Sequence, residues 1–324
     1  MKIPLPNKPR YNAYSQHLIN KFGEKVYKIP INLNGSCPNR DGVLGYGGCI
    51  FCDEQGSAFS PLPNTLPVIE HLRQGKDYFR QRFKAQKYIA YFQSFTNTYL
   101  PLAQFAANIY CAAKEEDIVG ISVSTRPDCV SDAYLDILTQ VQNEYDIEIN
   151  IELGLQTVNY RTLQKINRGH TLAEFIDATL RIHRRSFEIC AHVILNLPWD
   201  DLQDVVECAK IVSSLGIQAI KLHSLYIVRG TELGKMYERG ELELIALEQY
   251  IRRVIIFLEY LDPKIVLQRL VSKGPYDTVL FSNWGISWWR IKHEIERLLE
   301  AEDTWQGKKF NYLNGQQVSQ VNWI

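Results

Sequence analysis

Three of the seven cysteines, Cys37, Cys49 and Cys52, fall within sixteen residues in the spacing C-x11-C-x2-C. Thiolates bind zinc ions and iron–sulfur clusters. A closed structural zinc site needs four ligands, and this loop contains neither a histidine nor a fourth cysteine. Three thiolates are instead typical of a four-iron cluster that keeps one iron open. The sequence therefore favours a [4Fe-4S] cluster, with a zinc site and ordinary thiols as the two alternatives.

The other four cysteines are expected to be small, mostly buried side chains. They are scattered among apolar neighbours, and an odd total in a chain of 324 residues argues against a disulfide framework. They are Cys111, Cys129, Cys190 and Cys208.

Short apolar runs alternate with helical patterns through the first two thirds of the chain. The expected strands cover residues 28–33, 88–93, 118–124, 147–153, 188–195 and 219–225. The expected helices cover residues 68–83, 102–114, 131–143, 161–167, 171–186 and 202–215. This alternation predicts an α/β fold with a parallel sheet, either an open doubly wound sheet or a complete or partial barrel. Ligands bind at the carboxyl edge of such sheets, where the cysteine loop follows the first expected strand.

We divide the chain into three parts: a basic N-terminal arm (1–27), a core (28–239) and a C-terminal extension (240–324). The extension is expected to contain helices at 241–261 and 288–300, a short strand at 264–270 and an irregular polar tail. A mostly helical extension of this kind would pack on the core and cover the barrel mouth.

The cysteine loop resembles that of the radical S-adenosylmethionine (SAM) superfamily, with the spacing of its YhcC/YtqA-like branch. Five further motifs follow in an order that resembles the radical SAM core of the Elongator catalytic subunit. They are STRPD at 124–128, ELGLQ at 152–156, NRGH at 167–170, NLP at 196–198 and RGTEL at 229–233. The motif TWQGKK at 304–309 resembles the YhcC-like branch.

The resemblance implies a partial (β/α)6 TIM-like barrel and two cofactors, a [4Fe-4S] cluster and SAM. Cys37, Cys49 and Cys52 would hold three irons, and SAM would chelate the fourth. In this superfamily a reductant such as flavodoxin or ferredoxin supplies one electron, and SAM is cleaved to a 5′-deoxyadenosyl radical that abstracts a hydrogen atom. Such a radical needs a dry, enclosed site.

The resemblance also identifies candidate SAM-binding residues. Gln156 matches the glutamine that holds the SAM ribose, and Arg168 matches an arginine that pairs with the SAM carboxylate in related enzymes. Gln93 and Ser94 stand where relatives approach the SAM amino group with a glycine-rich backbone. Ser124 stands where several relatives carry a glutamate.

Three further polar residues are candidates with a structural alternative. Glu152 lies on the same expected sheet face as Gln156, so the two either bind a ligand or bond to each other. Arg126 either contacts SAM or forms an internal ion pair with Asp128. His192 is either a SAM contact or a buried, hydrogen-bonded histidine. The catalytic residue that meets the substrate is not identified.

We expect a tRNA-modifying transferase that acts at C5 of a wobble uridine. The 36 basic and 36 acidic residues cancel overall, but segments 1–28 and 71–87 each carry six basic residues against one acidic residue. These segments are either phosphate-facing surfaces or ordinary solvated ones. Two alternatives stay open: a radical SAM enzyme acting on a small metabolite or a protein, and a non-enzymatic iron–sulfur or zinc protein that binds partners or senses redox state.

Composition limits the class of protein further. With 46% hydrophobic and 22% charged residues, the chain resembles a globular protein rather than a disordered one. No apolar run approaches the roughly 20 residues of a membrane helix. The first residues also lack the apolar stretch of a secretory signal. We therefore expect a cytoplasmic protein with no membrane partner.

Overall fold

The computed structural model describes residues 9–53, 62–272, 274 and 278–316. Its centre is one sheet of seven parallel strands in the order β1-β2-β3-β4-β5-β6-β8. The bounds are β1 Val26–Ile31, β2 Lys87–Phe92, β3 Ile118–Thr125, β4 Glu148–Gln156, β5 Glu188–Ile194, β6 Ala219–His223 and β8 Val266–Arg269. The predicted α/β fold with a partial parallel barrel is confirmed.

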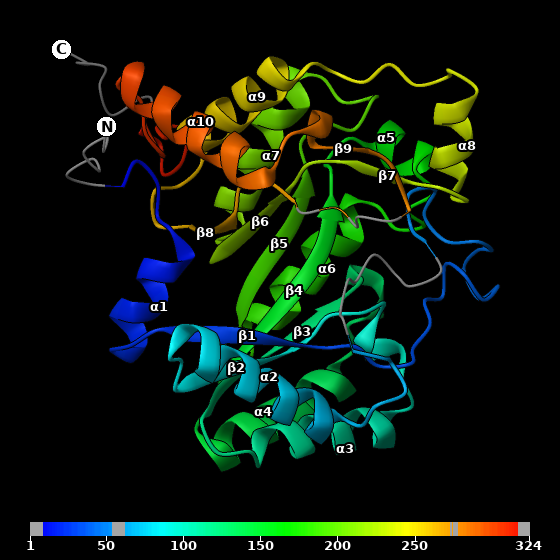
Figure 1. Cartoon of the computed structure of the whole chain (residues 1–324), viewed down its shortest axis with the longest axis vertical. Helices are drawn as coiled ribbons and strands as arrows, with labels where there is room; N and C mark the ends of the chain where they lie inside the picture. Colours follow the sequence, from blue (N-terminus) through cyan, green and yellow to red (C-terminus); the bar gives the residue numbers. More distant parts are fainter. Residues whose placement is uncertain (1–8, 54–61, 273, 275–277, 317–324) are drawn as a thin grey trace.

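Helices connect successive strands, as Figure 1 shows. Their bounds are α1 Tyr14–Phe22, α2 Val68–Phe83, α3 Leu102–Ala113, α4 Asp132–Tyr145, α5 Tyr160–Lys165, α6 Leu172–His183, α7 Leu202–Ser214, α8 Glu232–Glu238, α9 Leu247–Tyr260 and α10 Trp288–Ala301. Two helix starts are capped by side chains: Thr171 with Glu174 at α6, and Asp201 with Asp204 at α7.

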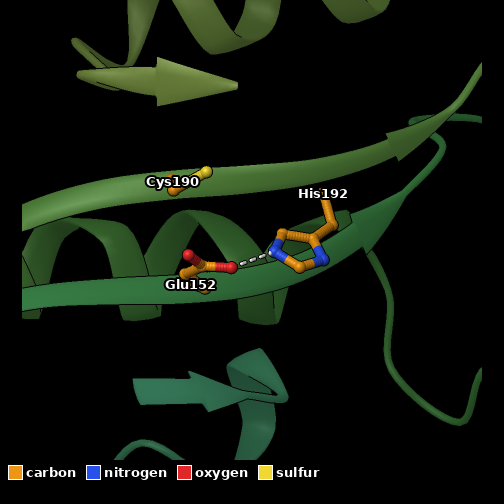
Figure 2. A group of neighbouring side chains, drawn as sticks. All are labelled: Glu152, Cys190 and His192. Atoms are coloured by element: carbon orange, nitrogen blue, oxygen red, sulfur yellow. Dashed lines mark hydrogen bonds and ion pairs between the residues drawn. The ribbon is translucent and has the colours of Figure 1, made fainter. Parts of the chain in front are cut away.

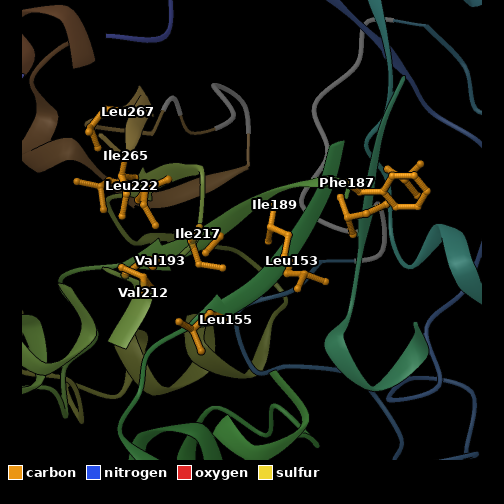
Figure 3. Packing of buried hydrophobic residues seen from close by; sticks show 14 of the residues in the cluster. Leu153, Leu155, Phe187, Ile189, Val193, Val212, Ile217, Leu222, Ile265 and Leu267 are labelled. Atoms are coloured by element: carbon orange, nitrogen blue, oxygen red, sulfur yellow. The ribbon is translucent and has the colours of Figure 1, made fainter. Parts of the chain in front are cut away.

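The strands alternate between an apolar outer side and a polar inner side. On β4, Ile151, Leu153 and Leu155 are buried in the apolar core. Figure 3 shows Leu153 and Leu155 there from close by. Glu152 lies between them in sequence and faces the barrel interior, because successive strand residues point to opposite faces. The helices thus cover one face of the sheet, and the other face encloses the cavity described below.

The barrel has one more strand than the six that the core motifs imply. Within the segment that we assigned to the extension, α9 leads into β8, which pairs in parallel with β6. Lys28 Nζ of β1 donates to Gln268 Oε1 of β8 at 3.1 Å, so a hydrogen bond links the first and last strands across the barrel interior.

The N-terminal segment contains a helix that the sequence analysis did not assign. Helix α1 precedes β1, and just before it Asn12 O accepts a hydrogen bond from Leu267 N at 2.8 Å. Lys2 and Lys8 of the predicted basic arm and residues 317–324 of the tail lie outside the described residues.

A second, two-stranded antiparallel sheet lies beyond the carboxyl edge of the barrel. It joins β7 Tyr226–Val228 to β9 Val279–Ser282 and carries α8 beside it. Helix α10 packs against α9. In the described part of the chain, no helix is both long and apolar enough to cross a membrane.

Candidate active site

One cavity of about 190 Å³ lies inside the carboxyl end of the barrel, beside the cysteine loop. Its lining brings together all three cysteines of the loop and seven of the eight predicted SAM-contact residues. These are Cys37, Cys49, Cys52, Gln93, Ser124, Arg126, Glu152, Gln156, Arg168 and His192. The eighth predicted residue, Ser94, does not belong to the described cavity lining, and its side chain is buried.

The cysteine loop is tied to the segment that follows α5. Asn39 Nδ2 donates to Asn167 O at 2.6 Å, and Asn167 Nδ2 donates to Gly48 O at 2.8 Å. Gly169 has φ +77° and lies so close to Asn39 that a Cβ there would be 2.7 Å from Asn39 Oδ1. A side chain at Gly169 would push the two segments apart.

A different guanidinium faces each sulfur of the cysteine loop. The distances are 3.9 Å from Arg126 Nη1 to Cys37 Sγ, 3.4 Å from Arg168 Nη1 to Cys49 Sγ, and 3.6 Å from Arg40 Nη1 to Cys52 Sγ. Guanidinium groups can donate hydrogen bonds to metal-bound sulfur and offset its negative charge. The chemistry of this donor set therefore fits a thiolate-bound iron–sulfur cluster.

Arg168 reaches the cavity through a gap in the side chains of β4. Its Nη2 donates to Gly154 O at 2.8 Å, and a Cβ at residue 154 would lie 2.5 Å from this nitrogen. The pairing of β4 with β5 is irregular between Gly154 and Gln156, and Gln156 has φ +73°. This irregular strand end places the Gln156 side chain next to Arg168, because Gln156 Nε2 would lie 3.0 Å from the same added Cβ.

The predicted alternative of an internal pair is present at Arg126. Its Nε and Nη2 donate to the two Asp128 oxygens at 2.9 and 2.8 Å. Burial opposes ionisation of Asp128, but the hydrogen bonds and charge of Arg126 hold its pKa below the ordinary value. Arg126 is thus fixed by a carboxylate on one side and still presents Nη1 to Cys37.

Glu152 is the centre of a buried polar network inside the barrel. Its carboxylate accepts hydrogen bonds from Lys28 of β1 and Lys221 of β6, and its Oε2 lies 2.6 Å from His192 Nε2 of β5. Tyr91 of β2 accepts a hydrogen bond from Lys221 Nζ at 3.1 Å. Burial works against its charge, yet Lys221 and Lys28 hold the pKa of Glu152 well below its ordinary range.

Figure 2 shows Glu152 directed toward His192, with Cys190 beside them. Their ligand atoms lie within 4.8 Å of one another, the spacing of a metal site. However, Glu152 already accepts from two ammonium groups, and burial with the Glu152 charge raises the pKa of Cys190 to about 12. A protonated thiol beside two cations is a poor cation site, so we interpret this group as part of the hydrogen-bond network.

The remaining cysteines lie outside the cavity lining. Burial raises the pKa of Cys129 to about 12, as it does for Cys190, and it also raises the pKa of Cys111 and Cys208. These thiols stay protonated at neutral pH.

Several residues of the site were missed from the sequence. Asn39 and Arg40 lie within the cysteine loop itself, so the loop was the signal, but no spacing rule tells which of its residues turns toward sulfur. Lys28, Tyr91 and Arg269 sit in expected strands, where a single polar residue gives no local sign of its partner.

Comparison with known proteins identifies the family. The radical SAM superfamily profile matches residues 32–212, and the Radical SAM C-terminal domain profile matches residues 217–301. The chain therefore belongs to the radical SAM superfamily, a superfamily of enzymes. The uncharacterized protein YtqA of Bacillus subtilis is 35% identical over 304 residues, which cover 94% of each chain. This similarity confirms the resemblance to the YhcC/YtqA-like branch.

More distant proteins share the core. A tRNA uridine(34) acetyltransferase of Methanocaldococcus jannaschii is 24% identical over 169 residues, which cover 51% of this chain and 30% of that protein. The solved structure of the archaeal Elp3 of Methanocaldococcus infernus superposes with a TM-score of 0.66 at 14% identity, covering 87% of this chain and 64% of that one. The superposition shows a common fold.

The His192 network predicts a loss of stability in mild acid. Burial and the Lys221 charge lower the pKa of His192 to about 4, whereas an unfolded histidine titrates near about 6.5. The unfolded chain therefore binds more protons between these values, and the free energy of unfolding falls as pH drops through that window, by up to about 1.4 kcal/mol per pH unit for one such group. Denaturant unfolding of the iron-free protein at pH 7, 6 and 5 measures this loss.

Two matched histidine variants test whether His192 causes this pH dependence of the free energy of unfolding. His192→Gln should make the pH dependence shallower, whereas His293→Gln, an exposed residue of α10, should keep the wild-type dependence. Equal slopes in His192→Gln and the wild type would contradict the assignment.

Proposed function

We propose that this chain binds a [4Fe-4S] cluster through Cys37, Cys49 and Cys52 and cleaves SAM in the adjoining cavity. The observation that carries the proposal is the arrangement of three sulfurs, each facing its own guanidinium, at one cavity. A zinc site is less well supported, because it needs a fourth protein ligand and the cysteine loop offers no fourth cysteine or histidine. Elsewhere in the described lining, Glu152 and His192 are bonded to each other, and the other histidine is His223 of β6.

When bound, the cluster would supply the electron for homolytic cleavage of the SAM C5′–S bond, received from a flavodoxin- or ferredoxin-type reductant. The role that we propose for the residues of the chain is to bind SAM and to orient it. Arg168 is nearly fully buried, and its Nε has no hydrogen-bond partner in the described structure. A buried guanidinium with a free donor suits a carboxylate, so we assign the SAM carboxylate to Arg168 and the ribose hydroxyls to neighbouring Gln156.

The other candidate residues support these two. Ser124 Oγ donates to Tyr91 OH at 3.1 Å, which fixes the serine where relatives carry a glutamate. Gln93 lines the cavity at the end of β2. Glu152 and His192 are occupied with each other, so we assign them a positioning role beneath the SAM site.

The cysteine assignment predicts which variants lose iron. Anaerobically reconstituted protein should bind about four irons per chain and absorb broadly near 400 nm. Cys37→Ala, Cys49→Ala and Cys52→Ala should each lose this absorption, because a cluster with two thiolates is not held. Cys129→Ala and Cys208→Ala are the matched controls and should keep it. A folded Cys129→Ala variant without iron would disprove the three-ligand assignment.

The SAM assignment predicts weaker binding in two further variants. Reduced protein without substrate should slowly cleave SAM to methionine and 5′-deoxyadenosine. Arg168→Ala and Gln156→Ala should each weaken SAM binding by roughly 1–3 kcal/mol, the usual effect of removing a buried or charged hydrogen-bond partner. Equilibrium dialysis measures the change, with Arg252→Ala, an exposed residue paired with Glu302, as the control. Unchanged affinity in both site variants would rule out these roles.

We further propose that the substrate is tRNA, modified at a wobble uridine. The support is the similarity of half of this chain to the tRNA uridine(34) acetyltransferase. That similarity covers 30% of the acetyltransferase, so the proposal concerns the substrate and leaves the transferred group open. The small-molecule alternative keeps the same radical site.

Many basic residues of the two predicted segments form ion pairs within the protein, which makes them less available to tRNA phosphates. Within segment 71–87, Arg73 pairs with Glu70, Lys76 with Glu115 and Arg80 with Asp117. Arg82 and Lys84 follow at the end of α2, just before β2 begins, so they lie at the edge of the sheet opposite to the cavity. In segment 1–28, Arg10, Lys21 and Lys28 are paired with acidic residues.

Arg161 and Lys165 are better placed. Both are exposed on α5, which follows β4 at the cavity edge, and neither has an acidic partner within 4.0 Å in the described structure. Unpaired cations near the site are available for phosphates, whereas paired ones must first give up a carboxylate.

If tRNA is the substrate, tRNA from a strain lacking this gene should contain an altered wobble uridine. Mass spectrometry of its nucleosides, compared with the parent, measures the change. Complementation with the wild-type gene should restore the parental nucleoside, and the Cys49→Ala gene should not. Identical nucleosides in both strains would favour the small-molecule alternative.

The same proposal separates the two basic surfaces. Arg161→Gln with Lys165→Gln should weaken tRNA binding and lower the slope of log affinity against log salt by up to about 2 units, about 0.7–0.9 per lost phosphate contact. Arg82→Gln with Lys84→Gln is the matched control at the opposite edge and should leave the slope unchanged. If only Arg82→Gln with Lys84→Gln lowered the slope, segment 71–87 would be the tRNA-binding surface instead.

A further inference from the structure

At the end of the cavity formed by the last strands, cationic and imidazole groups converge. His192 of β5, His223 of β6 and Arg269 of β8 all line the cavity. The sheet pairing places His192 beside Lys221 and Lys221 beside Arg269. The rings of His192 and His223 lie 5.1 Å apart between centroids.

Two of these groups have no partner within the described structure. Arg269 is half-buried and lines the cavity, and it forms no hydrogen bond or ion pair with any described residue. His223 Nε2 is fully enclosed and also lacks a hydrogen-bond partner in the described residues. An unpartnered buried donor has a free-energy cost of about 1–3 kcal/mol, and more beside a charge, so native structures rarely keep one without a ligand.

The local charge is also unbalanced. Lys28, Lys221 and Arg269 share one carboxylate, Glu152, whose hydrogen bonds go to the two lysines and His192. Arg269 is therefore left without a counter-ion. Burial, followed by the charge of Arg269, holds the pKa of His223 well below its ordinary value. His223 is neutral, and a neutral imidazole can donate one N–H to an anion beside the guanidinium.

The anion bound here is distinct from the SAM carboxylate. Arg168, to which we assign that carboxylate, follows α5 and contacts Cys49, whereas Arg269 comes from the last strand of the barrel and neighbours His223. The lining that the two arginines share also includes Ser224, Leu225 and Tyr226, which follow β6.

We propose that Arg269 and His223 form an anion subsite that binds one acidic group of the substrate, a carboxylate or a phosphate, inside the barrel. This inference rests on the proposed function, since it places the substrate in the same cavity as SAM. A guanidinium binds either group through two N–H donors. The subsite would then hold the substrate by its charged end and leave the rest directed toward the SAM site.

The test uses reconstituted protein with saturating SAM, so that Arg168 is occupied, and follows the melting temperature. Sodium acetate and sodium phosphate are titrated separately against sodium chloride of equal ionic strength. Binding to the folded state raises the melting temperature in proportion to the logarithm of ligand concentration. We expect a rise with at least one of the two anions, and the more effective anion identifies a carboxylate or a phosphate as the natural group.

Three site variants and one surface control make the result specific. Arg269→Gln and His223→Gln should each weaken the apparent affinity for the effective anion by about tenfold or more, as expected for loss of a charged or buried donor. Arg269→Lys should keep a part of the effect, because it keeps the charge without the two-donor geometry. Arg252→Gln is the surface control and should behave as the wild type. No anion effect in the wild type, or an equal effect in folded Arg269→Gln and His223→Gln, would overturn the proposal.

SAM cleavage without substrate separates this inference from the proposed function. The wild type and the surface control Arg252→Gln should both bind SAM and cleave it without added anion. Cleavage by the wild type without a variant-sensitive anion effect would reject the subsite alone. A variant-sensitive anion effect in protein that never cleaves SAM would reject the radical function and keep the subsite.

Discussion

The ion pairs of Glu152 join the inner side of the barrel. One carboxylate on β4 accepts from ammonium groups on β1 and β6 and contacts a histidine on β5. Removing one partner of a buried ion pair leaves an uncompensated charge, which destabilises a protein by about 3–5 kcal/mol. The strands that carry Lys28, His192 and Lys221 are therefore held at fixed distances from β4, and the cavity above them keeps its width.

The same constraint explains the two faces of the sheet. Residues that alternate with Glu152, such as Leu153 and Leu155, are fully buried against the helices and supply the apolar core. The inner residues need not be apolar, because their polar groups bond to one another across the barrel. A strand that is apolar on both faces would close this interior with side chains, whereas this one leaves room for ligands. The fold thus separates stability, on the outer face, from binding, on the inner face.

Local patterns in the sequence predicted the parts of the structure that depend on neighbours in the chain. Alternating strands and helices and the three clustered cysteines are patterns of this kind. Helix α1 was missed because it is short and Ala13 before it gives no side-chain cap. The partners of Cys37 and Cys49 come from distant segments, so only the fold pairs each sulfur with Arg126 or Arg168. In the basic segment 71–87 too, only the fold brings the carboxylates of Glu115 and Asp117, which follow α3, to Lys76 and Arg80.

The cavity therefore carries more positive charge than the chain itself neutralises. Arg126 and Asp128 balance each other, but Arg40, Arg168 and Arg269 have no carboxylate within 4.0 Å among the described residues. Arg168 is buried, and a buried cation is costly without a counter-ion. Thiolates that bind iron would balance the first two, and an anionic group at the far end would balance the third. Loading the site should therefore relieve a cost that the empty protein bears, which couples cofactor and substrate binding to the stability of the same barrel.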